Sequence, residues 1–95
     1  MQISMTSVYQ EWINTLKDQV GRARIQMRID RLSRGNPGQH RQLTDGIAEL
    51  KIDYGPGYRV YYTERRGELI VLLAGGDKAS QLRDIKSAIA LAKKL

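Results

Sequence analysis

The chain has 95 residues, of which 41% are hydrophobic and 27% charged, so we expect a single globular domain over residues 1–95 rather than a disordered segment. It has no cysteine, one histidine and no apolar run near the ~18 residues that span a bilayer, which excludes disulfides, thiolate or multi-histidine metal sites and a membrane helix. The net charge of +6 favours a polyanionic partner such as nucleic acid, with a merely solubilising surface charge as the alternative.

The N-terminal segment predicts a short strand followed by a helix. We expect the strand at residues 2–5 and the start of the helix near Ser7, because Ser7-x-x-Gln10 fits a capping box. The helix should end at Lys17-Asp18, and its apolar residues recur at helical spacing, as for a stripe that faces a core. This stripe consists of Tyr9, Trp12, Ile13 and Leu16.

A second helix is expected over residues 19–34, close enough to the first to form a helical hairpin. It should stop at the Gly-Asn-Pro-Gly of residues 35–38, because glycine suits a left-handed cap and proline cannot continue the turn. The helix carries a row of arginines between two apolar stripes. The weaker stripe could pack against the first helix, which we favour, or against a segment of a partner protein. The better stripe is Ile25, Ile29 and Leu32, the weaker is Val20, Ala23 and Met27, and the row is Arg24, Arg28 and Arg31.

After a loop at residues 35–46, the apolar period changes from helical to alternating, which predicts an antiparallel meander of three strands. The strand at 69–74 is apolar on both faces, so we expect it at the centre of the sheet, covered on both sides. In the first strand, Ala48, Leu50 and Ile52 alternate with Ile47, Glu49, Lys51 and Asp53, and the middle strand is expected at 58–63.

The chain closes with a predicted helix over residues 79–94, for which Asp77 is the expected N-cap. The order of strand, two helices, antiparallel strands and helix indicates an α+β domain. The helix is expected to turn Leu82, Ile85, Ile89 and Ala92 inward and a basic face of Arg83, Lys86 and Lys93 outward.

Several segments resemble a known family when they are taken together. The segment Leu50–Tyr62 resembles the central hairpin of the RelE/ParE toxin superfamily. The segment Leu72–Lys78, with Gln81 and Asp84 after it, is similar to the branch of addiction-module killer proteins, or HigB-like toxins. The resemblance covers nearly the whole chain, with further matches at residues 22–25, 31–32 and 35–38.

The resemblance implies a small twisted antiparallel sheet with an N-terminal helical hairpin and a C-terminal helix. It also implies a type II toxin that acts in the cytoplasm as a metal-independent endoribonuclease, without a cofactor, on messenger RNA in the ribosomal A site. The expected partners are therefore the ribosome with its messenger RNA and an antitoxin that carries a helix-turn-helix domain, and no membrane is involved.

Three basic residues are the candidates for the catalytic site. Arg59 matches the strand arginine of the family, whose role would be to clamp the scissile phosphate. Lys51 alternates away from Leu50 and Ile52, so it can share a face with Arg59 and act as a general base or phosphate contact. Lys78 falls near a basic residue that the family places after the last strand, where it would stabilise charge or assist the leaving group. Arg59 and Lys51 each have a plain alternative as a surface residue of a strand.

The arginine row and the tyrosines are candidates for RNA binding. Arg24, Arg28 and Arg31 fit phosphate contacts with ribosomal RNA, with a solvated helix face as the alternative. Tyr61 or Tyr58 fits stacking on a base, and we expect one of the two to pack in the core instead.

Other polar residues carry less functional weight. His40 is expected to be a solvated loop residue, and Gly75-Gly76 to be a plain strand exit rather than a phosphate site. Glu49, Asp53 and Asp77 are too few, and too close to lysines and arginines, to predict a metal site.

The chain departs from the RelE pattern in one respect. That toxin has a tyrosine soon after its last strand, whereas this chain has no aromatic residue after Tyr62. Two alternatives to the nuclease therefore stay open, because fold does not decide function. One is a ParE-like inhibitor of DNA gyrase without chemistry of its own, and the other is a non-toxic module whose only partner is the antitoxin.

Overall fold

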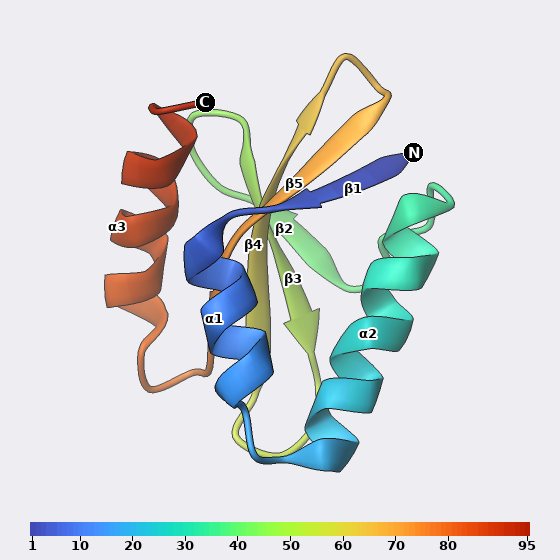
Figure 1. Ribbon diagram of the computed structural model, residues 1–95, viewed down its shortest axis with the longest axis vertical. Coiled ribbons are helices and arrows are strands. Elements are labelled where there is room, and N and C mark those ends of the chain that lie inside the picture. The colour runs from blue at the N-terminus through green and yellow to red at the C-terminus, as the bar shows by residue number, and fades with distance from the viewer.

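The computed structural model describes residues 1–95, which form a five-stranded sheet with helices on both faces (Figure 1). The elements are β1 (Gln2–Met5), α1 (Ser7–Thr15), α2 (Gln19–Ser33), β2 (His40–Gln42), β3 (Ile47–Ile52), β4 (Tyr58–Arg65), β5 (Leu69–Gly76) and α3 (Gln81–Ala92). The strand order across the sheet is β1-β5-β4-β3-β2. No helix combines the length and the hydropathy needed to cross a bilayer.

The predicted α+β class and the order of helices and strands are confirmed, with three corrections to the sheet. β1 pairs with β5 in parallel, so the sheet is mixed rather than wholly antiparallel. β2 forms inside the stretch expected to be a loop; its side chains are all exposed, so no alternation of apolar residues marks it, and backbone pairing with β3 holds it. β5 is covered on both faces as expected, but the central position belongs to β4.

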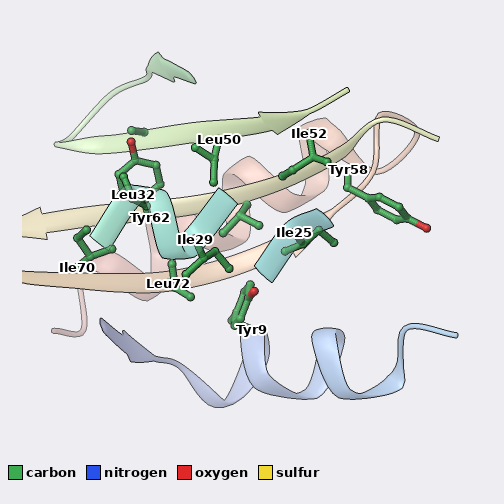
Figure 2. Close-up of a cluster of buried hydrophobic side chains, with 12 residues drawn as sticks. Tyr9, Ile25, Ile29, Leu32, Leu50, Ile52, Tyr58, Tyr62, Ile70 and Leu72 are labelled. Carbon is green, nitrogen blue, oxygen red and sulfur yellow. The ribbon is translucent and has the colours of Figure 1, made fainter. Parts of the chain in front are cut away.

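The larger core lies between the sheet and the two N-terminal helices. Ile25, Ile29 and Leu32 of α2 point toward the strands, and Tyr9 of α1 closes the cluster from its other side (Figure 2). Burying one such aliphatic side chain contributes about 1.5–3 kcal/mol, so this stripe anchors α2. The strands contribute Ala48, Leu50, Ile52, Tyr58, Val60, Tyr62, Ile70 and Leu72.

The smaller core lies on the opposite face, beneath α3. Leu82, which was expected to face inward, is 79% exposed, and Asp84 takes an inward position instead. The reason lies in the sheet: Gly76 has no side chain, and the Asp84 carboxylate occupies the space where a Cβ would stand. This contact sets the rotation of α3. The core residues of this face are Ile47, Tyr61, Val71, Leu73, Ala74 and Ala88.

Gly75 and Gly76 are the last two residues of β5 rather than an exit from the sheet. Because successive strand residues face opposite sides, each glycine admits a group from a different helix. A Cβ at Gly75 would overlap the indole ring of Trp12 from α1, and a Cβ at Gly76 would overlap Asp84 from α3. The pair therefore lets helices on both faces approach the sheet closely.

Two helix caps differ from the sequence prediction. The first helix begins at Ser7 as expected, but its N-cap is Thr6, whose Oγ1 accepts a hydrogen bond from the Tyr9 backbone N–H at 3.1 Å. Asp77 accepts hydrogen bonds from the backbone N–H groups of Ala79 and Ser80, and Ser80 is the N-cap of α3. Asp77 thus stabilises the turn before the helix rather than the helix itself.

A polar contact joins the start of α2 to β4. Asp18 is the N-cap of α2; its Oδ1 accepts from the Gly21 N–H at 2.9 Å and its Oδ2 from the Tyr58 hydroxyl at 2.7 Å. These two hydrogen bonds lower the pKa of Asp18, whereas burial first and the Asp18 contact second raise the pKa of Tyr58 to about 12.

This contact predicts how stability depends on pH. Because the folded-state pKa of Asp18 is lowered, its contribution is present above the ordinary value of 3.8 and is lost as the pH falls below it. Tyr58→Phe removes one of the two main bonds, so the variant should be less stable at pH 7 and should lose less stability below pH 4 than the wild type. Urea unfolding midpoints between pH 7 and pH 3 measure both effects. Parallel curves for the two proteins would contradict the role given to Asp18.

Candidate functional site

The register of the sheet brings Lys51 and Arg59 together. They are direct partners in the antiparallel pairing of β3 with β4, so both project from the same face of the sheet. Arg59 also pairs with Gly76 of β5, which places this face beside the start of α3. The expectation that period-two alternation would put Lys51 and Arg59 on one face is confirmed.

A groove of about 260 Å³ opens on this face at the end of the strands. Its lining is wholly polar, which distinguishes it from a pocket for an apolar ligand. The groove is lined by Gln39, His40, Arg41, Glu49, Lys51, Arg59 and Gln81.

Glu49 lies at the centre of this lining and is only 3% exposed. Its Oε2 accepts a hydrogen bond from Gln81 Nε2 at 2.9 Å, and its Oε1 lies 3.3 Å from Arg41 Nη2. Arg59 Nε lies 3.8 Å from Oε2, a distance for charge attraction but not for a hydrogen bond. Sequence reasoning missed this role, although a glutamate on the strand face that also carries Ile47 was a usable signal.

The side chain of Arg59 is only 7% exposed, and its donors are unequally used. Nη1 donates to the Gly57 carbonyl at 2.7 Å, which fixes the guanidinium against the preceding turn. Nε is buried and has no hydrogen-bond partner. A buried donor without a protein acceptor is costly.

Lys78 lies beside the same turn. Its backbone N–H points to the Pro56 carbonyl at 3.4 Å, and a Cβ added to Gly57 would lie 3.6 Å from its Cβ and 3.1 Å from Arg59 Nη1. Its side chain is exposed. The structure thus gathers the three basic candidates, Lys51, Arg59 and Lys78, at one end of the sheet.

The arginine row of α2 divides into different environments. Arg28 donates from Nη1 to the Lys51 carbonyl at 2.6 Å and from Nη2 to the carbonyls of Pro37 and Gln39 at 3.0 and 2.9 Å. Arg24 stacks on the Tyr54 ring at 4.5 Å and is exposed. Arg28 is therefore a clamp that ties the loop after α2 to β3. Arg31 is exposed, with no protein partner in an ion pair or side-chain hydrogen bond.

The proposed stacking of Tyr61 on a base does not fit its position. Tyr61 is fully buried beneath α3, and Tyr58 is also buried, so neither ring presents a free face. Burial, together with the nearby charge of Glu49, raises the pKa of Tyr61. His40 is exposed as expected, but it belongs to β2 and borders the groove.

The weaker apolar stripe of α2 lies outside the two cores. Val20 and Met27 are 52% and 57% exposed, and Ala23 is exposed as well, which corrects the expectation of core contacts. Ile25, Ile29 and Leu32 fill the space between α2 and the strands, whereas Ala23 borders a pocket that Tyr9 and Ile13 of α1 also line.

The family model for phage-derived protein Gp49-like (DUF891) matches residues 11–95, and this chain belongs to that family of RelE/ParE-like toxins from toxin–antitoxin systems. The chain is 46% identical over 95 residues to an uncharacterized protein of Haemophilus influenzae, a match that covers all of this chain and 96% of that protein. No solved structure matches the chain.

The different environments of Arg28 and Arg31 can be tested by measuring protein stability. Arg28→Ala removes three hydrogen bonds to carbonyls from a charged donor, so the free energy of unfolding should fall by roughly 2 kcal/mol. The matched control is Arg31→Ala on the same helix, which should change it by less than about 0.5 kcal/mol. Urea unfolding at neutral pH measures both values. Equal losses in the two variants would show that Arg28 is no clamp.

Proposed function

We propose that this protein is a HigB-like toxin of a type II toxin–antitoxin pair and that it cuts messenger RNA in the ribosomal A site without a metal ion. The observation that carries the proposal is the buried Arg59 guanidinium, which the Gly57 carbonyl holds in place on the same groove as Lys51. Family membership supports the toxin and its antitoxin partner, and the groove supports the chemistry.

The groove suits a phosphate for electrostatic reasons. A guanidinium held by the Gly57 carbonyl is fixed before the ligand arrives, so little conformational entropy is lost on binding. Surroundings with little water strengthen its attraction for an anionic oxygen. Lys51 stands opposite on the neighbouring strand and adds a second positive charge to the same face.

Cleavage requires stabilisation of the phosphorane charge, a proton for the leaving oxygen and a fixed orientation of the messenger RNA. Basic side chains can stabilise the charge and supply the proton. A phosphorane gains negative charge as the ribose 2′-oxygen attacks, and Arg59 with Lys51 would stabilise that charge. The leaving 5′-oxygen needs a proton, for which Lys78 lies beside Arg59 at the same turn. The ribosome would hold the messenger RNA in the reactive orientation.

Arg24 and Arg31 are the proposed contacts to ribosomal RNA from α2. Both are exposed, and with Met27 and Asp53 they line a second, shallow depression of about 450 Å³. Phosphate contacts of this kind release counterions, so binding to ribosomes should weaken steeply with salt.

The gyrase-inhibitor alternative keeps one observation in its favour. Tyr61 is buried and the lining of the groove contains no aromatic side chain apart from the imidazole of His40, so no tyrosine there stacks on a base. An inhibitor that binds a protein target would not need such a ring.

Primer extension on messenger RNA from programmed ribosomes tests the proposal. The wild type should produce ends in the A-site codon, and Arg59→Ala should lower the cleavage rate by roughly 10²–10³-fold, the usual cost of one lost oxyanion donor. The matched control is Arg65→Ala, an exposed arginine at the other end of the same strand, which should cut as the wild type does.

The same preparation separates the two functions. Absence of A-site ends, together with blocked DNA supercoiling by gyrase, would replace the nuclease with the inhibitor. Absence of both effects would leave the antitoxin as the partner that family membership indicates.

A further inference from the structure

We propose that Glu49 is a catalytic residue of this site and accepts the proton of the ribose 2′-hydroxyl at the position of cleavage. The inference rests on the proposed nuclease function and assigns a step that the basic side chains do not perform well. Glu49 is the one acidic side chain that lines the groove, where it lies among Arg41, Lys51 and Arg59.

The spacing between Glu49 and Arg59 indicates what belongs between them. Arg59 Nε is a buried donor without an acceptor, and Glu49 Oε2 lies 3.8 Å away, beyond hydrogen-bond distance. One group can satisfy both atoms if it accepts from Nε and donates to Oε2. A hydroxyl does both, whereas a phosphate oxygen without a proton only accepts.

The carboxylate is held in place from its far side. Gln81 of α3 donates to Oε2 at 2.9 Å, and Arg41 of β2 lies 3.3 Å from Oε1. Two neighbouring elements thus fix an acid whose side chain is only 4% exposed, which is the kind of orientation that a proton acceptor requires. An ion pair at the surface would not need to be held in place by residues of neighbouring elements.

Three of the charged and titratable groups around Glu49 are cationic, namely Arg41, Lys51 and Arg59. The surrounding groups are His40 and Arg41 of β2, Lys51 of β3, Arg59 and Tyr61 of β4, and Asp84 of α3.

The step balances without a metal or a redox partner. The 2′-hydroxyl gives its proton to Glu49, and the 2′-oxygen forms a bond to phosphorus. The bond between phosphorus and the 5′-oxygen breaks, and the 5′-oxygen takes a proton from Lys78. The products are a 2′,3′-cyclic phosphate and a 5′-hydroxyl end, with Arg59 and Lys51 stabilising the phosphorane charge.

Glu49→Gln is the decisive variant, assayed for cleavage on programmed ribosomes and for ribosome binding by co-sedimentation. We expect kcat to fall by roughly 10²–10⁴-fold while binding changes by less than about threefold, because a proton acceptor acts mainly in the transition state. The matched control is Glu64→Gln, an exposed acid near the far end of β4, which should leave kcat unchanged.

A second variant covers the case in which Glu49→Gln does not fold. Glu49→Asp keeps the charge that balances Arg41 and Arg59 but withdraws the carboxylate by one carbon–carbon bond. It should unfold near the wild-type temperature and lose roughly 10–100-fold in kcat, because misplacement by about 1 Å is costly.

The outcomes separate this inference from the proposed function. A wild type that makes no A-site cuts overturns both. A wild type that cuts, with a Glu49→Gln variant of equal kcat, overturns the role of Glu49 and leaves the nuclease intact.

Discussion

The contact between a buried carboxylate and a buried guanidinium governs this end of the molecule. Glu49 and Arg59 are 3% and 6% exposed, and neither charge would be tolerated there without the other. Removing one partner of such a pair typically costs about 3–5 kcal/mol, so the charges that would act on RNA also contribute to the fold. Because the sheet register pairs Lys51 with Arg59, a second cation of the groove lies next to the ion pair of Glu49 and Arg59. The same two residues therefore contribute to the stability of the fold and to the proposed site.

Backbone periodicity made part of the fold and site predictable from the sequence. Alternation in a strand has a period of two whatever the neighbours are, so Lys51 and Arg59 could be assigned to one face before any contact was known. The helices of residues 7–15 and 19–33 were predictable from their apolar stripes and caps. β2 escaped because three exposed residues carry no pattern, and only pairing with β3 defines the strand.

The other features of the fold and the site depend on tertiary contacts, which the local spacing of residues in the sequence does not reveal. The rotation of α3 depends on the space that Gly76 leaves for Asp84, so Leu82 turns outward although its spacing fits the inner face. Arg28 looks like its neighbours in the arginine row, yet three carbonyls of other segments occupy its donors. The strand face of Glu49 was readable from its alternation with Ile47, but its contacts with Gln81 of α3 and Arg41 of β2 were not.

The groove between β2, β3 and the start of α3 is the proposed receptor of the scissile phosphate and its neighbouring ribose. The most direct measurement is the structure of this protein on a ribosome whose A-site messenger RNA carries 2′-O-methyl groups that block cleavage. We predict a phosphate oxygen within hydrogen-bond distance of the Arg59 guanidinium and the modified 2′-oxygen within about 4 Å of Glu49, since the methyl group replaces the shared proton. Messenger RNA lying across another surface, with the groove empty, would contradict this prediction.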